Sequence, residues 1–96
     1  MSFIQIIDFH TTDLESIKKS HEKWLAATEG KRTIRRDIVA RDRNDPNHYV
    51  VLAFFDSYES AMENSALPET QASAEEFAAA ATGGMSFLDL DIVIDD

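Results

Sequence analysis

His21 is the side chain in this sequence on which chemistry is easiest to place. It falls between Ile17 and Trp24 at helical spacing, so one face of a helix carries both an imidazole and an indole. An imidazole exchanges protons near neutral pH, which makes His21 a candidate catalytic residue, either as a general base or as a contact to a polar ligand group. The alternative is a packed histidine with a single hydrogen bond, which is a common arrangement.

Aromatic side chains are numerous enough to line a cavity for a flat apolar molecule. We predict that Trp24 and Phe54 contact such a ligand, and that Gln5, on the first strand, belongs to the same site. Core packing is the alternative for the aromatic residues, because their large area makes them dominant in protein cores. The aromatic set considered for this cavity comprises Trp24, Phe3, Phe9, Phe54, Phe55 and Phe77.

Two further histidines, His10 and His48, stand at the end of one predicted strand and at the start of another. If these strands are antiparallel neighbours, the two imidazoles come close together at one end of the sheet, where Asp8 could join them in a weak metal site. No metal-ligand spacing supports such a site, and histidines of surface loops are the alternative. We therefore predict no metal.

Composition narrows the classes of partner. The 96 residues include 9 Lys or Arg and 18 Asp or Glu, a net charge of −9, which argues against nucleic acid or an anionic membrane surface. The chain has no cysteine, which excludes disulfides and thiolate chemistry. It has no glycine-rich phosphate loop, nucleophile elbow or paired-histidine zinc motif, so no cofactor is predicted. No signal peptide or membrane span is apparent, and a cytoplasmic protein is expected.

The elements that must position these residues follow a β-α-β-β-α-β order. Strands are predicted from β-branched and aromatic content at residues 3–9, 33–42, 48–55 and 86–94. A helix capped by Thr12 is predicted to begin near Asp13, and a second helical region, divided by Pro68, to run from Ser57 to Ala81. This order is that of the ferredoxin-like α+β fold, an antiparallel sheet in the order 4-1-3-2 with helices on one face.

The strands predicted at residues 3–9 and 48–55 are apolar on both faces, although the helices of this fold cover only one. A large uncovered apolar face is rare in a soluble monomer. The length of 96 residues predicts one domain, residues 1–96. From the uncovered face we predict that this domain forms a homodimer through the second sheet face. Partial cover by the chain's own termini and loops is the alternative.

The chain resembles the dimeric α/β-barrel superfamily, which includes the antibiotic-biosynthesis-monooxygenase-like domains. The element order and the two-sided apolar strands are similar over nearly the whole chain. The junction after the third strand is also similar, in the residues Phe55-Asp56-Ser57-Tyr58-Glu59-Ser60-Ala61, Asn64-Ser65 and Leu67-Pro68-Glu69-Thr70. The resemblance implies a barrel formed by two sheets across a dimer, with a ligand cavity between each sheet and its helices.

The resemblance also bears on activity. Haem-degrading members carry an Asn on the first strand, and a Trp and a His toward the second helix. Here the first strand carries Gln5, the single tryptophan is Trp24 on the first helix, and no histidine follows His48, so haem degradation is not expected. The enzymatic hypothesis is cofactor-independent monooxygenation, with His21 as the polar group and Trp24 shaping the cavity. A non-catalytic ligand-binding or structural dimer is the alternative.

Charge is distributed unevenly along the chain. All nine basic residues lie between Lys18 and Arg43, and residues 44–96 carry eleven acidic residues and no basic one. The second and fourth strands are the two edges of the predicted sheet, and in a barrel of two sheets these edges approach each other across the dimer. We predict that Arg35 of one subunit pairs with Asp89 and Asp91 of the other. An acid–base role for the paired carboxylates is the alternative.

Overall fold

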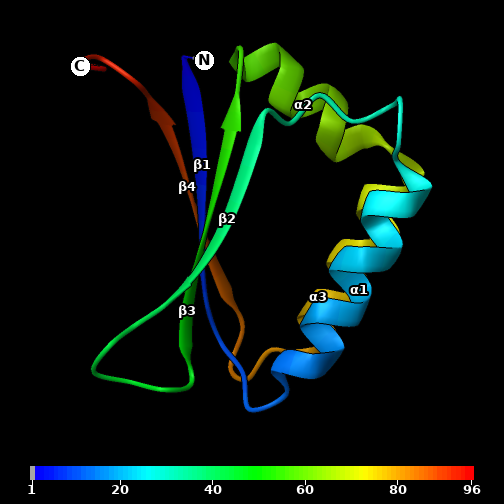
Figure 1. Cartoon of the computed structure of the whole chain (residues 1–96), viewed down its shortest axis with the longest axis vertical. Helices are drawn as coiled ribbons and strands as arrows, with labels where there is room; N and C mark the ends of the chain where they lie inside the picture. The colour runs from blue at the N-terminus through cyan, green and yellow to red at the C-terminus, as the bar shows by residue number, and fades with distance from the viewer. Residues whose placement is uncertain (1) are drawn as a thin grey trace.

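The computed structural model describes residues 2–96 and shows one antiparallel sheet with three helices on one face (Figure 1). The strands are β1 (Phe3–His10), β2 (Arg36–Arg41), β3 (His48–Phe55) and β4 (Met85–Asp91). The helices are α1 (Leu14–Ala27), α2 (Tyr58–Ala66) and α3 (Pro68–Ala80). The strand order is β2-β3-β1-β4, which confirms the predicted ferredoxin-like α+β fold and its sheet order.

Two predicted strands are too long, and the reason lies in their partners. β4 ends at Asp91, which pairs with Phe3, the first residue of β1, and one further hydrogen bond, from the Ile92 N–H to the Ser2 carbonyl at 2.8 Å, follows it. β2 begins at Arg36. The Arg35 N–H still donates to the Phe54 carbonyl of β3 at 2.7 Å, but Thr33 is bonded to α2. The Thr33 N–H donates to Asn64 Oδ1 at 3.1 Å, and its hydroxyl donates to the Ser60 carbonyl.

The N-cap of α1 differs from the prediction. Asp13, not Thr12, caps this helix, and its carboxylate accepts hydrogen bonds from the Ser16 N–H at 3.2 Å and from the Ser16 hydroxyl at 2.6 Å. The preceding Thr11 is buried, and its hydroxyl donates to the Ala80 carbonyl at the end of α3. The turn between β1 and α1 is therefore fixed by the cap that Asp13 provides and by the contact of Thr11 with α3.

The division of the second helical region at Pro68 is confirmed. Leu67 is extended between α2 and α3, and Pro68 occupies the first turn of α3, where the missing N–H is tolerated. None of the helices in the described part of the chain is long and apolar enough to cross a bilayer.

The register of the sheet decides which residues face the helices. β1 pairs with β3 from Phe3 opposite Phe55 to His10 opposite His48. The odd-numbered residues of both strands point to the helices and form the core, where Phe9 and Phe55 are almost fully buried. The even-numbered residues point to the other face, which no helix covers (Figure 1). On this outer face the apolar residues are Ile4, Ile6, Ile38, Val50, Leu52, Phe54, Leu88 and Leu90.

Candidate ligand-binding site

A cavity of about 160 Å³ lies between the helix-facing side of the sheet and the helices. A cavity of roughly 150 Å³ with apolar walls is large enough to hold benzene, so this one suits a single ring. Its walls are mainly apolar, and they are built by side chains from all four strands and all three helices. The residues that matter for its chemistry are Gln5, His21, Trp24, Asp37, Asn64, Thr70 and Ser73.

The structure brings three of the four predicted site residues together in this cavity. His21 and Trp24 reach it from α1, and Gln5 reaches it from β1. Phe54 does not line it. Its neighbours Ala53 and Phe55 do, because successive strand residues point to opposite faces, so Phe54 lies on the outer face of the sheet.

Most polar groups of the cavity wall are already bonded to other parts of the fold. The Trp24 indole N–H donates to Thr70 Oγ1 on α3 at 2.9 Å, and the Gln5 amide donates to Asp89 Oδ1 on β4 at 3.2 Å. The Asn64 carbonyl oxygen accepts the N–H of Thr33. These contacts fix the side chains across elements, and the cavity is therefore largely preorganised.

Asp37 on β2 is the functional candidate that the sequence did not single out. Its Oδ2 lies 3.7 Å from Nδ1 of His21. Its Oδ1 is buried and has no hydrogen-bond partner, and it is the only buried side-chain nitrogen or oxygen in this condition among residues 2–96. Burial raises the pKa of Asp37, while the charge of the His21 imidazolium acts in the opposite direction.

His21 also borders a second space. An open groove of about 440 Å³ runs along the surface between α1 and β2, and its lining includes His21, Lys18, Val39 and Arg41. The side chain of His21 is 38% exposed, and its ring stacks on Trp24 with the centroids 5.9 Å apart. The imidazole therefore stands between the interior cavity and the surface.

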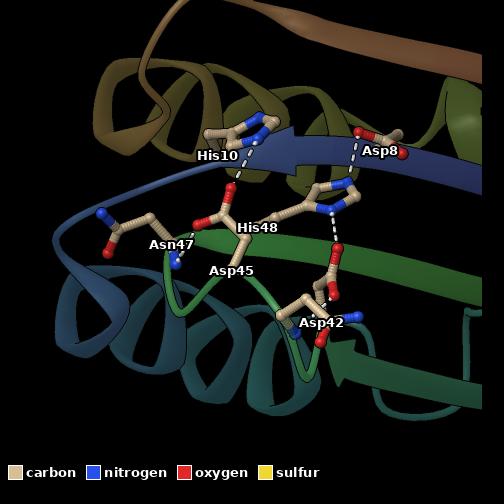
Figure 2. Close-up of polar contacts among 7 residues, drawn as sticks. Asp8, His10, Asp42, Asp45, Asn47 and His48 are labelled. Carbon is tan, nitrogen blue, oxygen red and sulfur yellow. Dashed lines mark hydrogen bonds and ion pairs between the residues drawn. The ribbon is translucent and has the colours of Figure 1, made fainter.

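His10 and His48 come together at one end of the sheet, as predicted, with their rings stacked 4.6 Å apart (Figure 2). His48 is held between two carboxylates, with Nδ1 at 2.9 Å from Asp42 Oδ2 and Nε2 at 2.9 Å from Asp8 Oδ1. The hydrogen bond to Asp42, followed by that to Asp8, raises the pKa of His48. Both ring nitrogens of His48 therefore have hydrogen-bond partners. No group of His, Asp or Glu in residues 2–96 is placed to hold a metal ion.

The charged residues predicted at the dimer interface have contacts within one chain. The Arg35 guanidinium donates to Asp56 Oδ2 from Nε at 2.8 Å and from Nη2 at 2.6 Å. Asp89 accepts the amide of Gln5, and Asp91 closes the pairing of β4 with β1. The pairing of Arg35 with Asp89 and Asp91 across a dimer stays a prediction, and it must compete with these contacts.

No protein-family model and no curated protein matches this chain. Solved structures do match it. A variant of SnoaB, a cofactor-independent oxygenase from Streptomyces nogalater, gives a TM-score of 0.78 at 15% identity, over 99% of this chain and 97% of its own. An antibiotic biosynthesis monooxygenase gives 0.76 at 14% identity, over 98% and 100%. A conserved protein from Methanosarcina mazei gives 0.79 at 8% identity, over 94% and 92%. At these identities the similarity establishes the fold, and the chain has the ferredoxin-like fold of antibiotic biosynthesis monooxygenase structures.

Proposed function

We propose that this protein is a homodimer that binds a small apolar or aromatic molecule in the cavity and oxygenates it without a cofactor. The observation that carries the proposal is a mainly apolar space of one-ring size with the His21–Asp37 pair in its wall. The similarity in fold to a cofactor-independent oxygenase supports the type of reaction. A location in the cytoplasm, which the cysteine-free composition suits, is part of the same proposal.

The proposed reaction needs a substrate that supplies its own electrons. Hydroquinone is the simplest ring of suitable size. With one O₂ it gives hydroxybenzoquinone and one water, so that one oxygen atom enters the ring and the other is reduced to water. Loss of a phenolic proton makes the ring a better electron donor, and His21, beside Asp37, is the base proposed to take up that proton.

The activity is tested with hydroquinone and ¹⁸O₂. The expected product is hydroxybenzoquinone that carries one labelled oxygen, formed without hydrogen peroxide. His21→Ala should lower the rate by about 100-fold, whereas His10→Ala, whose imidazole lies outside the cavity, should leave it unchanged. Ring binding without labelled product would contradict the oxygenase and leave the non-catalytic ligand-binding dimer.

The proposal that the protein is a dimer rests on the outer face of the sheet. Ile4, Ile6, Leu52 and Phe54 stand together on the two central strands, and no helix lies over them. Leu88, on the edge strand β4, is 53% exposed. An apolar face of this kind is well suited to contact with the same face of a second copy.

Sedimentation velocity tests the dimer. The wild-type protein should sediment as a dimer, and Leu52→Glu should convert it to a monomer because a carboxylate in the centre of the face opposes burial. Leu25→Glu, an equivalent change on the exposed side of α1, is the matched control and should remain dimeric. A wild-type monomer at micromolar concentration would rule out this part of the proposal.

A further inference from the structure

The groove between α1 and β2 has a charge opposite to that of the chain as a whole. The chain carries 18 acidic and 9 basic residues. Among residues 2–96, those that line the groove include Lys18 and Arg41 but no Asp or Glu. All nine basic residues lie between Lys18 and Arg43, in the part of the chain that forms most of α1, β2 and the connection between them. The groove is therefore a place where an anion can bind to a protein that otherwise repels anions.

The groove also has an apolar lining. α1 contributes Leu14 and Ile17, and β2 contributes Val39, which is 44% exposed. Tyr49 of β3 lines the groove as well, and it is the residue that pairs with Arg41 in the sheet. Apolar side chains beside cationic ones suit a molecule that has an apolar body and an anionic group.

The polar groups of the groove have few competing partners. The Arg41 side chain makes no hydrogen bond or ion pair with another residue of the described part of the chain. Lys18 is paired with Glu15 at 3.6 Å, but both side chains are largely exposed, and a pair of this kind contributes little to stability. Either cation can therefore turn to a ligand at low cost.

The hydroxyl of Tyr49 is a further group without a partner. Tyr49 is 6% exposed, and within residues 2–96 its hydroxyl makes no hydrogen bond. That oxygen keeps some accessible surface, because Asp37 Oδ1 is the only fully enclosed side-chain oxygen or nitrogen without a partner among those residues. Of the cavity and the groove, Tyr49 lines only the groove. A hydroxyl that is mostly buried and unbonded is well placed to donate to a bound anion.

We propose that the groove between α1 and β2 is a second binding site, and that it takes an aryl carboxylate larger than a single ring. Arg41 binds the carboxylate, because a guanidinium offers two parallel N–H donors to it, and Lys18 adds a second positive charge. The groove, with about 440 Å³, is larger than the one-ring cavity and can hold two fused rings. His21 is the only residue that lines both spaces, so the site does not depend on the reaction proposed in the cavity.

The test compares three probes by isothermal titration calorimetry at pH 7. 2-Naphthoate has two fused rings and a carboxylate, 2-naphthol has the same rings without a charge at this pH, and acetate has the charge without the rings. The proteins are the wild type, Arg41→Gln, Lys18→Gln and Tyr49→Phe. Lys19→Gln and Arg43→Gln are the matched controls, because each removes a neighbouring positive charge but neither residue lines the groove.

The wild type should bind 2-naphthoate more tightly than either 2-naphthol or acetate. Arg41→Gln should weaken 2-naphthoate binding by about tenfold or more, the effect of a hydrogen bond between charged groups, and should leave 2-naphthol binding unchanged. Lys18→Gln and Tyr49→Phe should each weaken it by about threefold. Glu15→Gln should tighten it by about twofold, because it removes the carboxylate that pairs with Lys18.

NMR of the ¹⁵N-labelled protein locates the probe. 2-Naphthoate should shift the backbone amides of Val39 and Arg41, which line the groove, more than those of Ala53 and Phe77, which line the cavity. Shifts confined to the cavity residues would place the probe in the cavity and would overturn the inference.

Several titration results would also overturn it. Absence of 2-naphthoate binding does so directly. Equal affinity for 2-naphthol means that the apolar surface alone binds, and equal affinity for acetate means that the charge alone does. Equal weakening in Arg41→Gln and Arg43→Gln means that the anion is attracted to the whole basic segment and not to this groove. An unchanged affinity in Tyr49→Phe contradicts the part assigned to the hydroxyl.

Discussion

Replacing Asp37 by leucine should make the fold more stable, although most substitutions of a partly buried residue do the opposite. The carboxylate occupies a position on β2 where its Oδ1 receives no hydrogen bond. Leucine has no polar atom to desolvate, and the adjacent cavity of about 160 Å³ leaves room for its larger side chain. If Asp37 lowers the stability of the fold, a functional role explains its presence at this position better than a structural role does.

The expected change in the free energy of unfolding is the difference between two opposing contributions. A buried acceptor without a partner costs about 1–3 kcal/mol. The ion pair with His21, whose side chain is 38% exposed, offsets at most about 1 kcal/mol because solvent screens it. The free energy of unfolding of Asp37→Leu should therefore exceed that of the wild type by roughly 1 kcal/mol. In a His21→Ala background, where the offsetting ion pair is gone, the gain should be larger.

The pKa of Asp37 determines how the gain in stability of Asp37→Leu depends on pH. Burial raises this pKa above its ordinary value of 3.8, so the folded protein holds the proton at pH values where the unfolded chain has already released it. The wild type consequently loses stability as the pH rises from 3.8 through the raised pKa. The advantage of Asp37→Leu should be largest above that range and should shrink below it.

Urea unfolding measures this difference, with Trp24 fluorescence and far-ultraviolet circular dichroism as independent probes. The proteins are compared at one concentration, because association of a dimer would otherwise change the apparent stability. Asp42→Leu is the control, since Asp42 is hydrogen-bonded to His48 and its loss should destabilise the fold. A loss of stability in Asp37→Leu equal to that in Asp42→Leu would refute the reasoning, because Asp37 would then behave as a paired carboxylate.

Three further predictions concern the scaffold. The hydrogen bonds of His48 to Asp42 and Asp8 raise its pKa above 6.5, so wild-type thermal stability should fall as the pH rises from 6.5 through the raised pKa, and His48→Gln should lack this fall in the melting temperature. Ser57 caps α2, and Ser57→Ala should lower the free energy of unfolding by about 1 kcal/mol in urea titrations, whereas Ser57→Asp should retain most of it. Phe9 is 1% exposed, and Phe9→Ala should lower the free energy of unfolding by about 3–5 kcal/mol by leaving a hole in the core.

Much of the fold could be predicted because its signals are local. Alternating and two-sided apolar strands, the turn before β3 and the proline that separates α2 from α3 each act over a few residues. The errors arise where a distant element decides the outcome. β4 ends at Asp91, opposite the first residue of β1, and Thr33 lies outside β2 because its N–H is bonded to Asn64 of α2. Neither partner can be identified from the residues around the error.

The candidate site shows the same division between local and distant information. Helical spacing places His21 and Trp24 on the core side of α1, and this could be read directly from the sequence. Strand alternation alone could not decide between Phe54 and its neighbours, because both faces of β3 are apolar and only the position of the helices distinguishes them.

Asp37 could not have been found from its own strand. β2 is an edge strand in which charged and apolar residues mix on both faces, and an aspartate in such a strand is usually solvated. It becomes part of a cavity wall only because α1 brings His21, sixteen residues earlier in the chain, to 3.7 Å from its carboxylate. A useful signal was nevertheless present. Asp37 is the only acidic residue of β2, and it precedes Ile38 and Val39 on a strand otherwise flanked by arginines. For a single carboxylate in a basic strand, the contacts made by the rest of the fold, and not the local sequence, determine whether the side chain faces solvent or a ligand.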